Sequence, residues 1–370
     1  MKAACDDCLR RGALIGLVAR RIADLLNRPR VPVVHSLLAL PDEQLLDAVA
    51  GNQRARIEAA YRRFRASTAR AAIAEARCEA VCVHCDDYPK RLTHLTDPPR
   101  PLYLRGGIER LARLSEEPGV AIVGGRQASR YALDVAEEMG RGLAAAGATV
   151  ISGLALGVDA ASHRGAMAGG DGAIAVLARG PDACYPTQHR SLYEQIVERG
   201  VVVSEIEPGI RPFRWSFPAR NRIMAALARV VVVVEAREQS GSLITAAFAE
   251  DLGRELGAVP GLVTARAAAG TNGLLRDGAT LVRDAEDVLD MLYGVGVRPR
   301  KPRPTPALEP RLRVVLDAVE VHDDLQLAAR RVGLSAGGLR AALGRLEALG
   351  LVKSDGLGGY MRCVAPGVGS

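Results

Sequence analysis

Glycines, serines and arginines follow directly after short apolar runs in the middle of this chain. Gly124, Gly125 and Arg126 come after one run, and Ser152 and Gly153 close the next. Glycine lets a backbone approach a ligand closely, free N–H groups at a helix start attract anions, and a guanidinium holds a phosphate through two hydrogen bonds. The pattern therefore predicts phosphate binding, with a tight turn between strand and helix as the alternative.

A second group of hydrogen-bond donors precedes an apolar helical stretch. Ser240, Gly241 and Ser242 combine two hydroxyls with backbone N–H groups. Such a nest of donors suits a phosphate, although a capped helix start accounts for the same residues. Neither a GxGxxG fingerprint nor a P-loop lysine accompanies these loops, which argues against a dinucleotide or nucleoside-triphosphate site.

The segment 208–222, PGIRPFRWSFPARNR, interleaves aromatic and basic side chains. These are Phe213, Trp215 and Phe217, with Arg211, Arg214, Arg220 and Arg222. Basic side chains that follow a phosphate backbone, beside aromatic faces on which bases stack, are typical of proteins that bind single-stranded nucleic acid. The alternative is a loop whose aromatic side chains anchor it to the core.

Asp159 and His163 stand four residues apart, so they share one face of a predicted helix. They are open to interpretation as a catalytic pair or as a structural hydrogen bond, and Asp159 also stands where a helix needs an N-cap. The loops otherwise supply donors, glycines and arginines, without a nucleophile–base pair or a metal cluster. This inventory favours a binding groove over a hydrolase, and we expect no catalytic residue.

Six short apolar runs position these loops. They are VAIVGG, TVISG, IAVLA, VVVSE, VVVVVE and AVPG, and helical stretches separate them. Continuous Val and Ile runs are typical of parallel strands buried on both faces, and their alternation with helices predicts an α/β fold with a doubly wound, Rossmann-like parallel sheet. Ligands of such sheets bind beyond the carboxyl ends of the strands, which is where the loops described above lie.

Composition divides the chain into five parts. Residues 1–80 have helical periodicity and predict an N-terminal helical domain, and residues 81–118 predict a connector that contains a strand. Residues 119–293 form the predicted core, and residues 294–310 form a linker rich in proline and arginine. Residues 311–366 show short helices followed by two strand-like pieces around a glycine-rich turn, which predicts a C-terminal winged-helix domain.

The 370 residues carry a net charge of +7, which permits a nucleic-acid partner but does not require one. The predicted core alone holds 17 basic and 20 acidic side chains, so its arginines must act through their placement. The sequence has no apolar stretch of about 18 residues and no secretory signal, so we expect no membrane contact. Seven cysteines in this length indicate a reducing compartment, and we expect a cytoplasmic location.

Two cysteine pairs have the spacing of zinc ligands. Cys5 and Cys8 form one pair, and Cys82 and Cys85 form the other, with His84 inside it. The 73 residues between the pairs exceed the loop of most zinc sites, although the pairs flank one helical domain and would meet if its ends were close. We therefore expect no cofactor and unliganded thiols, with a structural zinc site as the alternative.

Motifs through the predicted core resemble those of the DprA/Smf family of bacterial DNA-processing proteins. They are VAIVGGR (120–126), SGLALGVDAASH (152–163), CYP (184–186), VVSE (202–205), FPARNRIMAAL (217–227), EAREQSGSLITA (235–246), AVPG (258–261) and TNGLLRDGA (271–279). YPKRL (88–92) and DPPRPLYLRG (97–106) resemble the family's segment before the core. The motifs follow the family's order and cover nearly half of the chain.

This resemblance implies a homodimer that binds single-stranded DNA and helps to load the recombinase RecA during DNA uptake, transformation and recombination. It also implies a set of DNA-binding residues, namely Gly124, Gly125, Arg126, Ser152, Gly153, Arg214, Phe217, Arg220, Asn221, Arg222, Ser240, Gly241 and Ser242. Most of them would hold phosphates, and Phe217 would contact a base. The sequence departs from the family where Gly125 replaces a usual serine and Leu156 replaces a usual basic residue, and the second change predicts one phosphate contact fewer.

Two other functions stand as alternatives. A nucleotide phosphoribohydrolase shares a related core, but its PGGxGTxxE motif with the catalytic glutamate has no counterpart in EQSGSLITAA (238–247). A winged helix that reads double-stranded DNA needs more polar and basic side chains than SAGGLRAALGRLEALG (335–350) offers. We therefore expect an accessory role for the winged-helix domain and no enzymatic activity.

Overall fold

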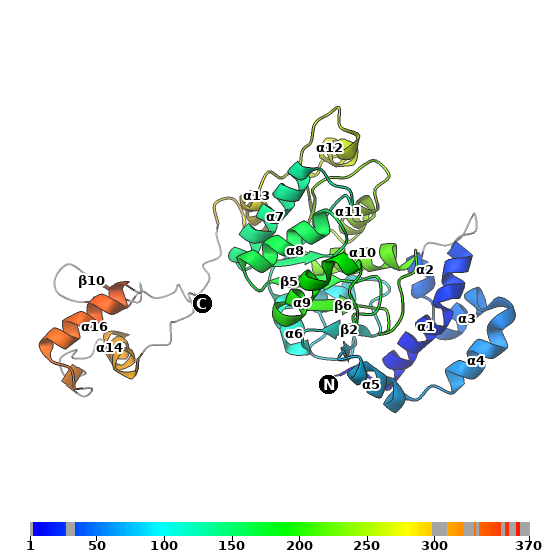
Figure 1. The fold of residues 1–370 in the computed structure, drawn as a ribbon, viewed down its shortest axis with the longest axis horizontal. Helices are drawn as coiled ribbons and strands as arrows, with labels where there is room; N and C mark the ends of the chain where they lie inside the picture. The colour runs from blue at the N-terminus through cyan, green and yellow to red at the C-terminus, as the bar shows by residue number, and fades with distance from the viewer. Residues whose placement is uncertain are drawn as a thin grey trace. The chain divides into compact units, whose positions relative to one another are not determined.

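The computed structural model describes residues 3–26, 34–297, 309–320, 329–330, 333–348, 352–354 and 360–362. The chain divides into two compact units, Met1–Pro299 and Arg300–Ser370 (Figure 1). Within the described residues, no helix has the length and apolar character that a membrane span requires.

A nine-stranded sheet forms the centre of the first unit. Its strands are β1 (Glu79–Val81), β2 (Leu102–Arg105), β3 (Gly119–Val123), β4 (Thr149–Ser152), β5 (Ala173–Val176), β6 (Val201–Ser204), β7 (Val230–Val233), β8 (Glu255–Ala258) and β9 (Thr280–Leu281). Their order across the sheet is β1-β2-β6-β5-β4-β3-β7-β8-β9. All neighbours from β6 to β9 are parallel, whereas β1 pairs with β2, and β2 with β6, in antiparallel orientation.

The predicted α/β fold with a parallel core sheet is confirmed, since β3 to β9 pair in parallel, and the antiparallel strands β1 and β2 make the complete sheet mostly parallel. The predicted connector supplies β1 and β2, which extend the sheet beyond β6. Every residue of β3 to β7 is buried, because helices cover both faces of these strands. Burial on both faces explains why these strands read as continuous apolar runs.

The two helical layers differ in which strand residues they cover. On one face, residues such as Val120 and Ile122 pack under α7 (Arg130–Ala145), α8 (Val158–Gly169), α9 (Arg190–Arg199) and α13 (Ala285–Tyr293). On the other face, Ala121 and Val123 pack under α10 (Ser216–Leu227) and α11 (Gly241–Asp251), with α6 (Ile108–Glu116) nearby in the same apolar cluster. A further helix, α12 (Ala269–Arg276), contacts β8. Alternate strand residues therefore point to opposite helical layers, as in a doubly wound sheet.

Among the described residues before the sheet there are five α-helices, so the predicted N-terminal helical region is confirmed. They are α1 (Asp6–Leu26), α2 (Val34–Leu38), α3 (Asp42–Val49), α4 (Arg54–Arg62) and α5 (Ala66–Glu75). Leu14, Val18 and Ile22 of α1 share one buried cluster with Ile206 and Trp215 of the core. The helices and the sheet belong to one compact unit, and the finer division at residues 80 and 118 stays a prediction.

The second unit contains α14 (Pro310–Glu320), α16 (Ala336–Ala348) and the antiparallel pair β10 (Val352–Ser354) and β11 (Tyr360–Arg362). Leu312, Val315, Leu346 and Val352 form its apolar cluster. Residues 298–308 of the expected linker, and parts of the expected winged helix, lie outside the described residues. The winged-helix assignment therefore stays a prediction.

The order of the strands places the ligand-binding edge of the sheet. From β3 the chain proceeds to β4, β5 and β6 on one side, and it then returns to β7 on the other side of β3. The loops after β3 and β7 therefore diverge, and such a point opens a crevice at the carboxyl ends of the strands. A hydrogen bond of 2.7 Å from the Gly125 N–H to the Glu235 carbonyl joins the two loops at its base.

Candidate functional site

Two adjoining hollows at this edge of the sheet bring together nine of the thirteen residues expected to bind DNA. Both hollows are lined by Arg126, Ala155, Phe217 and Arg220. The other expected residues that line one or the other are Gly124, Gly153, Asn221, Ser240, Gly241 and Ser242. We call the two hollows together the strand-end groove.

Three neighbouring side chains, Arg126, Phe217 and Tyr185, form one wall of the groove. The Arg126 guanidinium lies 4.9 Å from the centroid of the Phe217 ring, a cation–π distance. The Phe217 and Tyr185 rings follow with centroids 6.0 Å apart. Arg126 is exposed, Tyr185 is 42% exposed, and the Arg126 guanidinium forms no hydrogen bond or salt bridge with any described residue. The wall therefore offers free cationic donors beside two aromatic rings.

Arg220 forms the floor of the groove. Its Nη1 donates to the carbonyls of Gly153 at 2.6 Å and Val176 at 2.8 Å, and its Nε donates to the Asn221 side chain at 3.1 Å. Its Nη2 lies 3.5 Å from the Asp159 carboxylate. Burial raises the pKa of Asp159 and lowers the pKa of Arg220, while the opposite charge of each partner counteracts both shifts. Arg220 thus ties α10 to the ends of β4 and β5, and only Nη2 has donor capacity left for a ligand.

Glycine at position 153 makes room for this guanidinium. A Cβ atom built there would lie 1.6 Å from Arg220 Nη1 and 2.0 Å from its Cζ. A Cβ at Gly125 would meet its nearest neighbour, the Glu235 carbonyl oxygen, at 3.5 Å, which is ordinary contact. The space at position 125 explains how a serine, usual there in the resembling family, fits the same loop.

We expect Gly153→Ala to destabilise the fold by about 1–3 kcal/mol, the usual cost of overpacking a buried position. The added methyl group displaces Arg220 from the two carbonyls that it holds. Gly125→Ala is the matched control and should change the free energy of unfolding by less than about 0.5 kcal/mol. Urea unfolding of both variants measures the difference, and equal stability of the two would contradict this role of Arg220.

The start of α11 forms the opposite rim. Ser240 is the N-cap residue: its hydroxyl accepts the Ser242 N–H at 3.4 Å and lies 2.7 Å from the Ser242 hydroxyl. The Asn221 amide donates to the Gly241 carbonyl at 3.1 Å, which attaches this rim to α10. The residues that cap the N-terminus of α11 are also those of the expected anion site. Both roles belong to this end of the helix, because its free N–H groups need a cap and carry the partial positive charge that attracts an anion.

Four of the expected residues do not line the groove. Ser152 is wholly buried and its hydroxyl donates to the Ile122 carbonyl, while Gly125 contributes backbone hydrogen bonds beneath the loop. Arg214 is exposed on the loop before α10 but lines neither hollow. Arg222, the fourth, lies in the core.

Arg222 is 1% exposed and all five of its N–H donors are used inside the protein. Nε donates to the Asp97 carboxylate and Nη2 to the Asp97 carbonyl, while Nη1 and Nη2 together hold the Glu205 carboxylate, and Nη1 also donates to the Ala219 carbonyl. Burial lowers the pKa of Arg222, but the two carboxylates outweigh this and raise it above its ordinary value. Arg222 therefore has no donor left for a phosphate.

The aromatic residues of segment 208–222 divide into two roles. Trp215 is 3% exposed and its indole N–H donates to the Ala19 carbonyl in α1 at 2.9 Å. Phe213 stacks on Trp215 with centroids 6.2 Å apart. These two residues anchor the loop, as the alternative interpretation held, and Phe217 is the aromatic residue of the segment that lines the groove.

Asp159 and His163 do not form a pair. The Asp159 carboxylate faces Arg220, whereas His163 is wholly buried and neither of its ring nitrogens has a hydrogen-bond partner among the described residues. Burial lowers the pKa of His163 to about 4, so the imidazole is neutral at physiological pH. The structure therefore supports neither the catalytic pair nor the structural hydrogen bond between these residues.

Tyr185 and Ile244 line the groove although the sequence did not mark them as site residues, and Leu156, where the sequence predicts one phosphate contact fewer, lines it as well. Each of the three is 42% exposed. All three lie inside motifs that the sequence singled out, CYP, SGLALG and SGSLITA. Such residues read as core positions in a sequence, because only the packed structure shows which apolar side chains remain exposed.

Residues 79–293 match the model of the family described as DNA recombination-mediator protein A, which is more than half of this chain. The chain belongs to the DprA/Smf family. The matched range begins at β1 and ends with α13, so the DprA/Smf match includes every strand of the nine-stranded sheet and the whole groove.

Individual DprA/Smf relatives also match this chain and support its membership of the family. Protein Smf of Synechocystis is 33% identical over 303 residues, which are 73% of this chain and 76% of the relative. A protein of Mycobacterium tuberculosis that carries the DprA name is 45% identical over 201 residues, which are 54% of this chain and 52% of the relative. The chain thus matches about half the length of the second relative.

Two solved DprA structures share the fold. The X-ray structure of DprA from Streptococcus pneumoniae has a TM-score of 0.60 and 29% identity, and the match covers 77% of this chain and 96% of that one. A structure that describes the single-stranded DNA binding mode of DNA processing protein A from Helicobacter pylori has a TM-score of 0.53 and 31% identity. This match covers 58% of this chain and 95% of the H. pylori chain. Neither the family description nor these relatives' names denote an enzyme.

Proposed function

We propose that this chain binds single-stranded DNA in the strand-end groove. The wall formed by Arg126, Phe217 and Tyr185 carries this proposal, because it places a guanidinium without a hydrogen-bond partner among the described residues beside the half-buried Phe217 ring and the exposed Tyr185 ring. An aromatic ring accepts any base by stacking, and a guanidinium holds a phosphate through two hydrogen bonds. The H. pylori relative, which is described for its single-stranded DNA binding, supports the same function.

The contacts follow from the geometry of the groove. Phosphates bind to Arg126 on one wall and to the serine-rich start of α11 on the opposite rim, with the Arg220 Nη2 between them. Phe217 and Tyr185 receive bases, which a single strand exposes and a duplex keeps stacked. Because none of these contacts reads a base edge, we expect little dependence on sequence.

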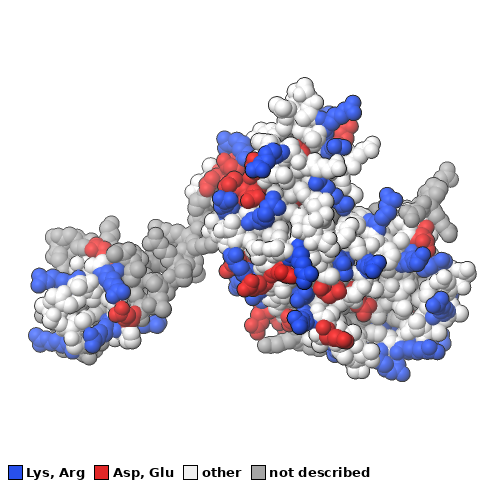
Figure 2. Space-filling model, viewed as in Figure 1, with Lys and Arg blue, Asp and Glu red and all other residues white. Residues whose placement is uncertain are grey.

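In this proposal, single-stranded DNA binds because a few arginines lie at the right positions in the groove, and not because the protein carries a large net positive charge. Figure 2 shows basic and acidic side chains interspersed over the visible face of the first unit, without one continuous basic surface. A general electrostatic attraction would need such a surface. The groove instead depends on a few arginines at the strand ends, of which Arg126 is the most available.

We further propose that the chain acts as a homodimer that passes the strand to RecA, with its C-terminal unit as an accessory winged helix. The family's description as a recombination mediator supports a transfer to a recombinase. The helices α14 and α16, followed by the β10–β11 hairpin, agree with the winged-helix proposal. Light scattering of the purified chain and stimulation of RecA strand exchange on protein-coated DNA test the dimer and the transfer separately.

A competition binding experiment tests the proposed substrate. Fluorescence anisotropy with a labelled oligonucleotide should show at least about tenfold tighter binding to the single strand than to the duplex of the same length. Affinity for the single strand should fall by about tenfold or more between about 50 and 200 mM salt, because phosphate contacts release counterions. Equal affinity for both forms, or turnover of nucleoside monophosphates by the purified protein, would contradict the proposal.

A further inference from the structure

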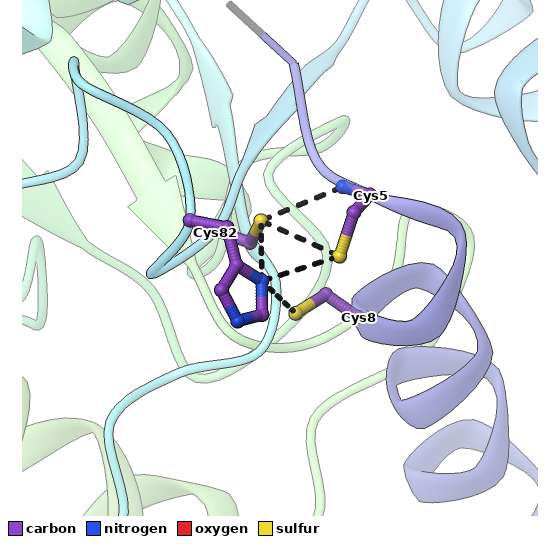
Figure 3. A group of neighbouring side chains, drawn as sticks. Cys5, Cys8 and Cys82 are labelled. Atoms are coloured by element: carbon purple, nitrogen blue, oxygen red, sulfur yellow. Dashed lines mark hydrogen bonds between the residues drawn. The ribbon is translucent and has the colours of Figure 1, made fainter. Parts of the chain in front are cut away.

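We propose that Cys5, Cys8, Cys82 and His84 bind a structural zinc ion that attaches the N-terminal helices to the sheet. One ligand atom from each of these residues lies within 4.8 Å of all the others. Figure 3 shows the three cysteine side chains converging from two segments that are distant in sequence. Cys5 and Cys8 lie at the start of α1, whereas Cys82 and His84 follow β1. This inference is independent of the DNA-binding groove.

The distances fit a tetrahedral ion. Zinc–sulfur bonds of about 2.3 Å and zinc–nitrogen bonds of about 2.0 Å place tetrahedral ligand atoms about 3.5–3.8 Å apart. The His84 Nδ1 lies 3.3, 3.7 and 3.8 Å from the sulfurs of Cys5, Cys8 and Cys82. The sulfurs of Cys5 and Cys82 are 3.9 Å apart. The Cys8 sulfur lies within 4.8 Å of the sulfurs of Cys5 and Cys82, so the four ligand atoms surround a space that a zinc ion can occupy.

The backbone around the cluster provides the support that thiolate ligands need. The Cys5 N–H points at the Cys82 sulfur at 3.4 Å, and the start of α1 adds the partial positive charge of a helix N-terminus. The Ala4 N–H donates to the Ala80 carbonyl at 2.8 Å, and Arg70 donates to the Ala4 carbonyl and pairs with Asp6. The segment that carries Cys5 and Cys8 is therefore held against β1 and α5 by contacts other than the cysteines.

His84, rather than Cys85, completes the ligand set. The Cys85 sulfur is 3.7 Å from the Cys82 sulfur but does not belong to the group of four mutually close ligand atoms. It instead accepts the Cys82 N–H at 3.4 Å. The pairing of Cys82 with Cys85 expected from their spacing is therefore replaced by a set of three cysteines and one histidine. Four protein ligands leave no open position, so the ion is structural and not catalytic.

The ion would close a loop that contains the whole helical region. All five helices lie between the start of α1 and β1, so the two halves of the cluster are the two ends of that region. A metal that joins distant segments stabilises a fold because the unfolded chain cannot hold the ligands together. Removal of the ion should therefore loosen the attachment of the helical region to the sheet.

Metal analysis of the full chain, expressed without a polyhistidine tag and kept reduced, tests the proposal. We expect one zinc ion per chain, and reconstitution with Co²⁺ should give the visible spectrum of a tetrahedral ion with thiolate ligands. Absence of stoichiometric zinc, an octahedral cobalt spectrum, or a disulfide between Cys5 and Cys82 in the freshly purified protein would overturn it. These readouts use the native chain, so they do not depend on whether a variant folds.

Variants then assign the fourth ligand. Cys82→Ser and His84→Ala should reduce zinc from one per chain to none after dialysis against a chelator. His84→Cys, which supplies another thiolate, should retain the ion. Cys85→Ser and Cys184→Ser, which lie outside the group of four, should also retain it. Loss of zinc from Cys85→Ser together with its retention in His84→Ala would contradict the assignment of His84.

Discussion

Arg222→Ala is expected to destabilise the fold by about 3–5 kcal/mol, the range for removing one partner of a buried ion pair. The substitution leaves the Asp97 carboxylate, at 2.8 Å from Nε, and the Glu205 carboxylate, at 2.7 Å from Nη2, without the cation between them. It also removes the link between α10 and the segment that leads into β2. Urea unfolding followed by circular dichroism measures the loss.

A surface arginine provides the control for this effect. Arg190 forms an ion pair with Glu194 one helical turn away, and its side chain is 80% exposed. Arg190→Ala should change the free energy of unfolding by less than about 1 kcal/mol, because water screens an exposed pair. Folded Arg222→Ala protein should bind single-stranded DNA within about twofold of the original chain, since an energy change below about 0.4 kcal/mol corresponds to that factor. If Arg222→Ala left the stability unchanged but greatly lowered the affinity for DNA, Arg222 would be a DNA-binding residue and its structural role would be wrong.

Arg126→Ala is expected to weaken single-strand binding by about ten- to a hundredfold. A hydrogen bond to a charged group contributes about 1.5–3 kcal/mol, and each 1.4 kcal/mol is a factor of ten in affinity. The substitution removes the cation above Phe217 together with its free donors. We also expect the slope of log affinity against log salt to decrease by about one, the value for one lost phosphate contact.

Two variants separate this effect from a general loss of charge. Arg130→Ala removes a cation four residues away whose side chain is 87% exposed and paired with Asp134, and it should leave affinity within about twofold. Arg126→Lys keeps the charge but loses the planar fork, so it should bind with intermediate affinity. Equal losses for Arg126→Ala and Arg130→Ala would show that net charge, rather than the groove, determines binding.

The central strands were predictable because their environment leaves a strong signal in the sequence. Burial on both faces favours apolar residues at most positions of β3 to β7, and the loops at their ends could then be placed on one edge. The sequence does not assign β1 and β2, the two strands beyond β6, to the sheet, because they are short and lie among prolines and turns. β2 joins the sheet through β6, which is about a hundred residues away in the chain, and β1 joins it through β2.

The sequence could not predict which arginines keep free hydrogen-bond donors for a phosphate. Arg126, Arg220 and Arg222 all stand in motifs that imply phosphate binding, but the structure leaves them with different numbers of free donors. Arg222 is occupied by Asp97, which is 125 positions away in the sequence, and Arg220 by carbonyls at the ends of β4 and β5. No spacing rule shows such partners, since tertiary contacts decide which donors remain. The same limit applies to His84, which takes the ligand position that spacing assigned to Cys85.

The position of the strand in the groove can be measured directly by photochemical cross-linking. An oligonucleotide that contains bromodeoxyuridine reacts on irradiation with aromatic side chains against which its bases stack, and mass spectrometry identifies the tryptic peptides that carry it. We expect cross-links in peptide 215–220, which contains Phe217, and in peptide 180–190, which contains Tyr185. Both should disappear in high salt, because phosphate contacts hold the strand. Cross-links confined to the second unit, with none in these two peptides, would contradict the claim that the strand-end groove binds single-stranded DNA.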